Sequence, residues 1–232
     1  MAASINKKKG KRVKMLRQRI PETDNGIQGE ITVLQYDQMQ RSFRDKGWME
    51  TTSLISSGIT DGHCLEIGHG PGYLGLEWLK LTQKTTLTGL DISPDMQVLA
   101  MKNAKSYNLT DRTKYELGQS DKMPFQNDSF DAVFSNGSLH EWNNPVGAFN
   151  EIHRVLKPGG KYFISDLRRD VNFFMYGFLW LGVRPTQMRP GLSTSVGAAY
   201  TANEITEILQ KSLLNDAKVK TNLIGLEITG MK

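Results

Sequence analysis

The sequence predicts an α/β protein built on a doubly wound, mostly parallel β-sheet. Five short apolar runs have the length of strands and are separated by segments of helical length, a pattern typical of βαβ units. Two further runs near the C-terminus alternate apolar and polar residues on either side of Gly225, which indicates an antiparallel hairpin. A glycine-rich turn follows the first apolar run, where the backbone of such a sheet can approach a ligand.

Each element is predicted from its apolar periodicity and from the signals at its start. Ser93 followed by Pro94 is typical of a helix start, because the serine caps the first amides and proline suits the first turn. The predicted strands are residues 63–67, 86–90, 114–116, 131–134, 161–165, 219–223 and 226–229. The predicted helices in this part of the chain are residues 72–81, 94–108, 146–155 and 202–214.

The N-terminal part of the chain divides into an arm and a cap. Residues 1–30 are expected to form a basic flexible arm, and residues 31–58 a helical cap. The cap carries an irregular apolar face made of Ile31, Leu34, Met39, Phe43 and Trp48. Residues 59–232 then form the main domain, with residues 171–200 as a candidate lid over its substrate.

The charge of the chain is concentrated in the arm. Eight cations and no acid precede Glu22, whereas the remainder holds 21 cations and 24 acids. A basic arm of this kind could bind a phosphate backbone or an anionic lipid surface. Because such runs are more often solvated tails, we do not favour nucleic-acid binding.

Composition also narrows the class of protein. No stretch reaches the roughly 18 apolar residues of a membrane span, and the N-terminus lacks the apolar run of a signal peptide. We therefore expect a cytoplasmic protein. The single cysteine, Cys64, allows no disulfide within the chain and no thiolate metal cluster, and it is expected to be a small strand hydrophobe. No metal is predicted, and the sequence leaves the oligomeric state open.

The chemistry is expected where the first strand ends, in the segment Glu66-Ile67-Gly68-His69-Gly70-Pro71-Gly72. Its glycines allow a tight turn and a close approach of ligand to backbone, and the next helix points its N-terminus at that ligand. Residues 70–75 also match the dinucleotide pattern G-x-G-x-x-G. The loop alone therefore leaves NAD or FAD open as ligands.

Further sequence segments after the glycine-rich loop distinguish between the possible ligands. Segments 66–72, 90–96, 118–125, 130–141 and 151–161 resemble, in order, the motifs of class I S-adenosylmethionine-dependent methyltransferases, especially the branch of quinone-biosynthesis C-methyltransferases. A dinucleotide site would explain only the first block and Asp91. The resemblance implies a Rossmann-like, seven-stranded sheet, S-adenosylmethionine as cofactor, and the following cofactor-binding residues: Glu66, Gly68, His69, Gly70, Gly72, Asp91, Ile92, Met96, Gln119, Ser120, Asp121 and Asn136.

The resemblance also implies roles for several of these residues. Glu66 would organise the glycine turn and the methionine end of the cofactor. Asp91 would accept hydrogen bonds from both ribose hydroxyls, which suits a carboxylate, and Ile92 would lie against the adenine. Gln119 stands where the family usually has aspartate, so it and Asp121 are rival partners of the adenine amino group beside Ser120. Asn136 could equally cap its loop.

His140 is the catalytic candidate, because the family places this loop beside the site of methyl transfer. An imidazole there could remove a proton from the acceptor near neutral pH, although a packing histidine is equally compatible with the sequence. Glu141, His69 and Asp166 could play the same part. Methyl transfer needs mainly alignment and exclusion of water, so the sequence does not require any catalytic residue.

The acceptor pocket is expected outside the cofactor blocks, above the carboxyl ends of the strands. Its candidates are Tyr36 in the cap and Phe174 and Tyr176 in the aromatic run 173–182. That run could be a lid or a core helix. The proline, glycine and serine residues between 185 and 195 suggest a mobile connection behind it.

These observations favour S-adenosylmethionine-dependent methyl transfer to a small-molecule acceptor by in-line displacement. Two alternatives stay open: an RNA-directed methyltransferase that uses the basic arm, and a noncatalytic protein that binds S-adenosylmethionine and interacts with a partner.

Overall fold

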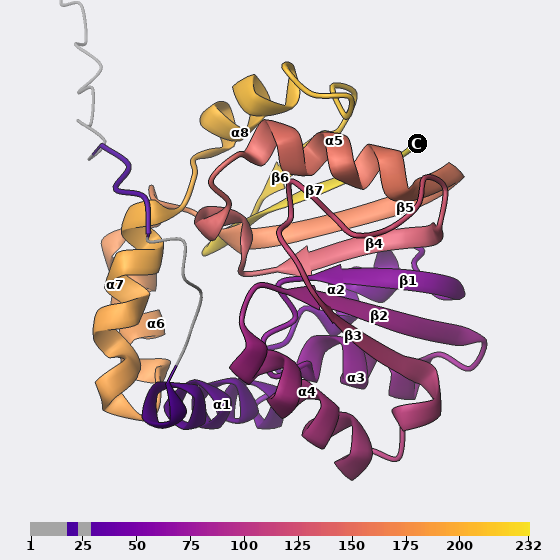
Figure 1. Cartoon of the computed structure of the whole chain (residues 1–232). Coiled ribbons are helices and arrows are strands. Elements are labelled where there is room, and N and C mark those ends of the chain that lie inside the picture. Colours follow the sequence, from indigo (N-terminus) through magenta and orange to yellow (C-terminus); the bar gives the residue numbers. More distant parts are fainter. Residues whose placement is uncertain (1–17, 23–28) are drawn as a thin grey trace, which may run out of the picture.

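A seven-stranded sheet forms the centre of the computed structural model, which describes residues 18–22 and 29–232 (Figure 1). The strands lie in the order β3-β2-β1-β4-β5-β7-β6. β1 to β5 are parallel where they pair, and β7 runs antiparallel to both β5 and β6. The mixed sheet and its C-terminal hairpin confirm the predicted fold class. The strands are β1 Gly62–Ile67, β2 Thr85–Asp91, β3 Thr113–Leu117, β4 Phe130–Asn136, β5 Leu156–Leu167, β6 Lys218–Thr221 and β7 Gly225–Met231.

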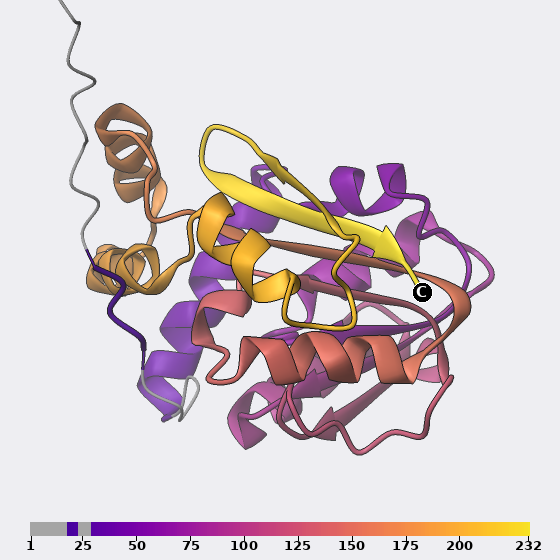
Figure 2. The same ribbon diagram turned by 90° about the horizontal axis from the view of Figure 1, so that it is seen from above.

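Helices cover both faces of the sheet, as Figure 2 shows from above. The α-helices are α1 Glu30–Asp45, α2 Thr51–Ser56, α3 Tyr73–Leu81, α4 Pro94–Ser106, α5 Pro145–Val155, α6 Phe173–Gly182, α7 Arg189–Ala198 and α8 Ala202–Leu209. Three short 3-10 turns are η1 Thr110–Arg112, η2 Leu139–Glu141 and η3 Thr186–Met188. Among the described residues, no helix has both the length and the apolar character needed to cross a membrane.

The core is divided by the sheet because successive strand residues point to opposite faces. On one face, Cys64 and Phe134 pack with α2 and α3, where the Phe134 and Trp78 rings lie 5.5 Å apart. On the other face, Leu65 and Val133 pack with the apolar sides of α5 and α8. Cys64 is fully buried in β1, which confirms it as a strand hydrophobe.

The strand order reverses at β1, whose neighbours are β2 and β4. The connections from β1 to β2 and from β4 to β5 therefore run on opposite faces and separate at the carboxyl ends of β1 and β4. Such a switch point opens the crevice in which doubly wound sheets bind their ligands.

The start of α4 agrees with the prediction. The Ser93 hydroxyl accepts a hydrogen bond from the Met96 amide at 3.3 Å, and Pro94 occupies the first turn. The helix ends at Ser106, two residues before the predicted end, because Asn108 takes the left-handed conformation with φ 57°. β5 begins at Leu156 and not at the predicted residue 161.

The predicted apolar face of the cap is wrong. The cap is two helices, and Ile31 and Leu34 are 73% and 55% exposed. α1 instead buries Val33 and the carboxylate of Asp37, which accepts a hydrogen bond from the Tyr73 hydroxyl at 2.8 Å and pairs with Arg41. A polar contact therefore attaches α1 to α3.

Two predictions near the C-terminus also need correction. The helix predicted for residues 202–214 ends at Leu209, because the Ser212 hydroxyl donates to the Leu209 carbonyl and the Leu213 amide donates to Asn150. Gly225 lies in β7 and not between the strands. The turn is made by Asn222, whose side-chain oxygen accepts from the amides of residues 224 and 225.

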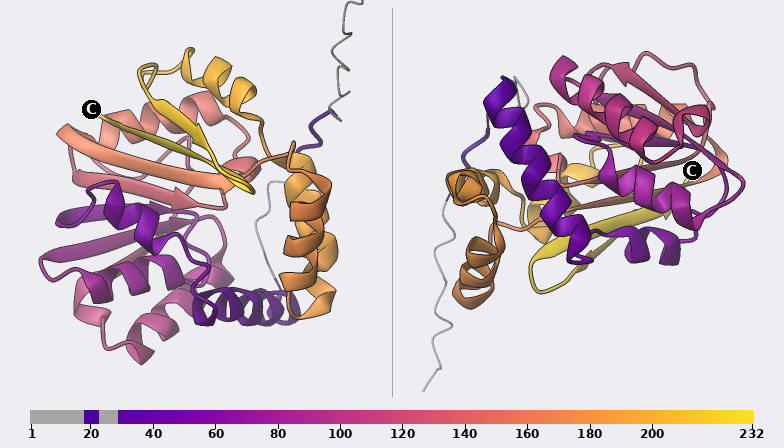
Figure 3. Two further views of the ribbon diagram at one scale, coloured as in Figure 1. Left: turned by 180° about the vertical axis from the view of Figure 1, so that it is seen from behind. Right: turned by 90° about the horizontal axis from the view of Figure 1, so that it is seen from below.

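The candidate lid is a pair of helices that stands opposite the carboxyl ends of the parallel strands, as Figure 3 shows from behind. Residues 189–198, which lie in the segment predicted to be a mobile connection, form the helix α7, and Pro190 suits its first turn. α6 is not a core helix, because it buries none of its residues against the described chain. Residues 1–17 and 23–28, which make up most of the predicted arm, lie outside the described residues.

Candidate functional site

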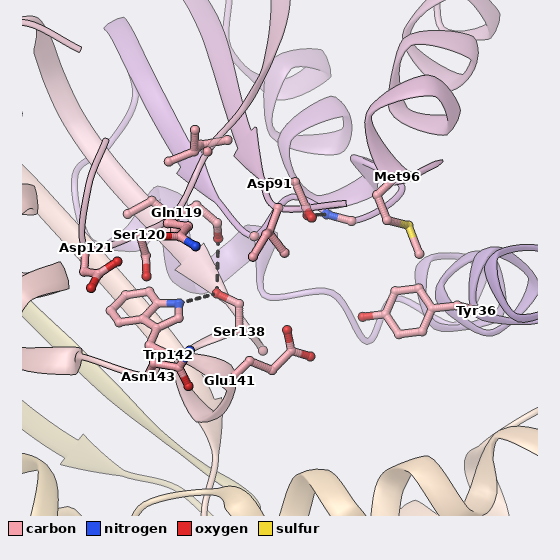
Figure 4. A pocket seen from close by; sticks show the side chains of 17 residues that line it. Tyr36, Asp91, Met96, Gln119, Ser120, Asp121, Ser138, Glu141, Trp142 and Asn143 are labelled. Carbon is pink, nitrogen blue, oxygen red and sulfur yellow. Dashed lines mark hydrogen bonds between the residues drawn. The ribbon is translucent and has the colours of Figure 1, made fainter. Parts of the chain in front are cut away.

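A cavity lies at the carboxyl ends of β1, β2 and β4, where the strand order reverses (Figure 4). It gathers residues from α1, from the start of α4, from the loops after β1, β2, β3 and β4, and from η2. The lining residues are Tyr36, Ile67, Gly68, Gly70, Leu90, Asp91, Ile92, Met96, Gly118, Gln119, Ser120, Asp121, Gly137, Ser138, Glu141, Trp142 and Asn143. Four of the five predicted blocks therefore supply walls of one cavity, and the fifth is α5 with the start of β5.

The glycine loop is held in a shape that only glycine accepts. Gly68 has φ 66°, and a Cβ atom there would lie 2.4 Å from the Cβ of Ser138. Gly72, which precedes α3, has φ 83°. Both values fall in the left-handed region that strains other residues. The loop consequently exposes backbone along the cavity floor at Gly68 and Gly70.

Asp91 fixes the geometry of this loop from the end of β2. One carboxylate oxygen accepts from the Gly70 amide at 2.9 Å, and the other accepts from the Ser93 amide at 2.9 Å. Each oxygen has a second lone pair, so the carboxylate can still accept hydrogen bonds from a ligand in the cavity.

Glu66 and His69 lie behind the loop, not in the cavity wall. Glu66 is 3% exposed, and burial raises its pKa to about 8. The His69 ring packs 4.8 Å from the Tyr115 ring, and burial lowers its pKa although Asp91 opposes the shift. One side-chain atom of each, Glu66 Oε2 and His69 Nε2, has no hydrogen-bond partner within the described residues. The structure thus places both residues where they support the loop.

The first half of the third block, residues 118–121, lines the cavity. Gln119, Ser120 and Asp121 all reach it, so the structure keeps both Gln119 and Asp121 beside Ser120 as predicted rivals. Ile92 and Met96 line the wall that continues from Asp91. Ile92 is 39% exposed, which leaves an apolar surface open to a flat ligand.

The fourth block holds its loop through a small hydroxyl network. The Ser135 hydroxyl donates to the Ile67 carbonyl at 2.8 Å and lies 2.7 Å from the Ser138 hydroxyl. The Trp142 indole donates to the same Ser138 oxygen at 3.2 Å. Asn136 instead faces β5, where its amide donates to the Ser165 hydroxyl at 2.8 Å.

His140 is buried beneath the cavity in contact with Asp166. Its Nδ1 atom lies 2.9 Å from both carboxylate oxygens of Asp166, and its amide donates to the same carboxylate at 2.7 Å. Burial alone would lower the pKa of His140, but the charge and hydrogen bond of Asp166 outweigh it and raise that pKa to about 9. The imidazole is therefore protonated near neutral pH.

Glu141 lines the cavity next to His140. Burial raises its pKa to about 7, although the charge of His140 opposes the shift. Its Oε1 atom lies 3.9 Å from His140 Nε2, and Oε2 of Glu22 lies 3.8 Å from the same nitrogen. These three side chains place one ligand atom each within 4.8 Å of one another, but a protonated His140 has no lone pair to offer a cation.

The segment before the cap reaches this site. Arg19 donates to the carbonyls of His140 and Ala198 at 2.8 and 2.5 Å, and its guanidinium lies 4.1 Å from the centre of the Tyr200 ring. Glu22 follows three residues later beside His140. Residues 18–22 therefore connect η2 with the C-terminal end of α7.

The predicted pocket residues separate into two groups. Tyr36 lines the cavity and accepts a hydrogen bond from Gln40 at 2.9 Å, and burial raises its pKa. Phe174 is 83% exposed on α6, away from the cavity. Tyr176 is hydrogen-bonded to Ser193 of α7 at 2.7 Å. Phe174 and Tyr176 thus belong to the lid helices and not to the cavity wall.

Several lining residues were missed by the sequence reasoning. Trp142 and Asn143 follow directly on Glu141, so continuing the fourth block by two residues would have found them. Ser138 also lines the cavity and lies within that block. Glu22 carries no sequence signal, because only the tertiary fold brings it to His140.

Comparisons with known proteins agree with this site. Residues 65–164 match the sequence pattern of a methyltransferase domain. A sterol 4-C-methyltransferase of Caenorhabditis elegans is 36% identical over 45% of this chain and 31% of that protein. A ubiquinone/menaquinone biosynthesis C-methyltransferase of Geobacter sp. strain M21 is 27% identical over 66% of this chain and 63% of its own length. The chain thus spans less than two thirds of these relatives.

A solved structure from Methanococcus maripaludis, assigned as an S-adenosyl-L-methionine-dependent methyltransferase, shares the fold. Its TM-score is 0.68 at 25% identity, over 86% of this chain and 91% of that one. The sheet and the glycine-loop cavity have the form of a class I methyltransferase domain. Residues 65–164 match a methyltransferase domain, and the chain resembles the class I S-adenosylmethionine-dependent methyltransferases, with the quinone C-methyltransferase branch among its relatives. These findings confirm the predicted resemblance and the predicted cofactor.

The cavity fits this cofactor in chemistry. A carboxylate with free lone pairs stands at the end of β2, as ribose hydroxyls require, and Ile92 offers an apolar face for a base. Because Gly70 has no side chain, an extended part of a ligand can lie against the backbone of the glycine loop. A Cβ atom at this position would lie 3.4 Å from the Tyr36 ring and would narrow that space.

We predict that Asp166→Asn lowers the pKa of His140 by more than about one unit, because it removes the carboxylate charge that stabilises the imidazolium. NMR titration of the histidine ring measures this pKa directly. Since the folded-state pKa of about 9 exceeds the unfolded value of about 6.5, the pair stabilises the fold fully below about pH 6.5. That stability, on the order of 3 kcal/mol at most, is lost as pH rises through about 9.

The matched control is Asp170→Asn, which breaks a surface ion pair with Arg168 and should leave the His140 titration unchanged. An unchanged His140 pKa in folded Asp166→Asn would show that Asp166 does not hold the proton on this ring.

Proposed function

We propose that this chain transfers the methyl group of S-adenosylmethionine to a small-molecule acceptor. When bound, the cofactor supplies a methyl group activated on a cationic sulfur, which passes to the acceptor by in-line displacement. We assign Asp91 to the ribose and Ile92 with Met96 to the adenine. The glycine loop at Gly68 and Gly70 takes the methionine end.

The third block completes the proposed cofactor site. Gln119, Ser120 and Asp121 stand at the adenine edge, where a side-chain oxygen and a backbone amide can recognise the base. Glu66, His69 and Gly72 act through the loop, because each supports it from behind and leaves the cavity wall to its neighbours. We assign Asn136 the same supporting part, through its hydrogen bond to Ser165.

The observation that carries the proposed chemistry is the pairing of Glu141 with His140. Glu141 reaches the cavity and has a pKa raised to about 7, so it can take a proton near neutral pH. His140 is already protonated, and its Nδ1 is engaged by Asp166. We therefore propose Glu141 as the general base and His140 as the cation that positions and stabilises it, in place of the histidine base expected from the sequence.

The acceptor lies, in this proposal, between Glu141 and the Tyr36 hydroxyl, which line the same end of the cavity (Figure 4). As the acceptor gains the methyl group, its proton passes to a carboxylate oxygen of Glu141. α1 brings Tyr36 over Gly70 and helps to exclude water.

The charges around this site favour a small acceptor over a nucleic acid. Asp91, Asp121 and Glu141 line the cavity, and Glu22 and Asp166 lie directly behind it. His140 opposes this group with one positive charge. Acidic walls repel a phosphate backbone, and they tolerate a neutral or cationic molecule. The sterol and quinone-biosynthesis methyltransferases among the chain's relatives support the same choice.

A transfer assay with methyl-labelled cofactor tests this function. We expect label to enter small acceptors from a panel of phenols, enols, sterols and amines, and not bulk RNA. Full-length protein that labels RNA and none of the small acceptors would overturn the proposal in favour of the RNA-directed alternative. Cofactor binding without label in any acceptor of either kind would favour the noncatalytic alternative.

We predict that Glu141→Gln lowers kcat by roughly 10²- to 10⁴-fold on an acceptor that must lose a proton, because the amide cannot accept it. The wild-type rate should rise with pH through about 7 as Glu141 ionises, and this rise should vanish in the variant. Cofactor affinity, measured by calorimetry, should change little.

Glu116→Gln on the exposed edge strand β3 is the matched control, and it should keep both the wild-type rate and its pH profile. A wild-type kcat in Glu141→Gln would show that Glu141 is not the general base. This result would not contradict the proposed cofactor site.

A further inference from the structure

The lid helices carry an apolar surface that the described chain leaves uncovered. α6 reads Phe173-Phe174-Met175-Tyr176-Gly177-Phe178-Leu179-Trp180-Leu181-Gly182 and buries none of these residues against the described chain. Phe173 and Phe174 are 81% and 83% exposed, and Leu181 is 62% exposed. Figure 2 shows α6 standing clear of the sheet. Apolar patches of this kind on a protein surface mark a binding site.

The patch has an ordered geometry. Phe174, Phe178 and Leu181 follow the spacing i, i+4, i+7 and therefore share one side of α6. Phe178 is anchored to the cap, where its ring lies 5.5 Å from that of Trp48. The Lys46 side chain donates to the Gly182 carbonyl at 3.2 Å. α6 is thus held against the cap through Phe178, while Phe174 and Leu181 on the same side stay largely exposed.

Two cations border this apolar surface. The guanidinium of Arg189 lies 3.9 Å from the centre of the Trp180 ring, and the Lys46 ammonium lies 4.8 Å from that of Trp48. An apolar face bordered by indole rings and basic side chains matches the boundary between lipid headgroups and acyl chains. A helix of ten residues is too short to cross a bilayer, so it suits a position in the plane of the interface.

The basic arm is joined to the same lid. The Ile20 amide donates to the Gly197 carbonyl at 3.1 Å, and Arg19 binds the Ala198 carbonyl, both at the end of α7. Seventeen residues precede Gln18 outside the described structure, and they carry seven of the eight cations that come before Glu22. Such a polybasic segment complements a surface of anionic lipid.

We propose that α6 forms a docking surface for an anionic membrane. α6 enters the headgroup layer with its exposed phenylalanines, and Lys46 and Arg189 at its border pair with lipid phosphates. The surface stands over the carboxyl ends of the parallel strands, so docking turns the side of the domain that carries the cavity toward the bilayer. The proposal requires no particular methyl acceptor and is independent of catalysis.

Vesicle flotation with the full-length protein, without cofactor, tests the docking surface. We expect binding to phosphatidylserine–phosphatidylcholine vesicles that is at least about 10-fold tighter than to phosphatidylcholine alone. The double substitution Phe173→Asp and Phe174→Asp should weaken this binding at least about 10-fold, because aspartate does not enter the acyl region. Both side chains are more than four fifths exposed, so circular dichroism should show an unchanged fold.

Val98→Asp with Met101→Asp is the matched control, since both side chains are exposed on α4, away from the lid, and binding should stay at the wild-type level. Replacing Lys46 and Arg189 by glutamine should reduce the preference for anionic vesicles. Equal vesicle binding by the wild type and the phenylalanine variant would overturn the proposal. A wild-type protein that does not bind anionic vesicles would overturn it as well. Tight RNA binding, or a dimer that the phenylalanine variant disrupts, would then show what the surface binds instead.

Discussion

The carboxylate of Asp91 is the contact on which the rest of the site depends. It ends β2 and accepts hydrogen bonds from the Gly70 amide in the loop after β1 and from the Ser93 amide before α4. Asn103 of α4 completes the connection by donating to the Pro71 carbonyl at 2.9 Å. Two neighbouring strand ends, a left-handed glycine turn and a helix start are thereby fixed relative to each other at the switch point of the sheet.

Local signals were enough to predict this part of the molecule. The glycine turn, Asp91 and the Ser93 cap each follow from the chemistry of residues close in sequence, and the order of the blocks identified the family. The mixed seven-stranded sheet was predictable for the same reason, because the apolar periodicity within each element and the spacing between elements can be seen in short stretches of sequence. The cofactor roles of individual residues remain predictions that rest on their places in the cavity wall.

Other features could not be predicted, because they depend on contacts between residues far apart in the sequence. The apolar face of the cap was wrong because α1 is attached through buried Asp37 to Tyr73, and no pattern within the helix reveals that partner. No sequence pattern indicates that His140 pairs with Asp166, which lies 26 residues further along the chain. This carboxylate holds a proton on the imidazole ring. Glu22 reaches the same histidine only because residues 18–22 lie against η2 and α7. Charge at the site is thus a property of the tertiary fold.

Calorimetric titration of wild type and Asp91→Asn with S-adenosylmethionine and with NAD tests the central claim most directly. The account predicts that the wild type binds S-adenosylmethionine and not NAD. It also predicts that folded Asp91→Asn binds S-adenosylmethionine roughly 10- to 100-fold more weakly, because the ribose loses a charged acceptor. Asp111→Asn on η1 should bind like the wild type. Preference for NAD, or an unchanged dissociation constant in Asp91→Asn, would contradict the account.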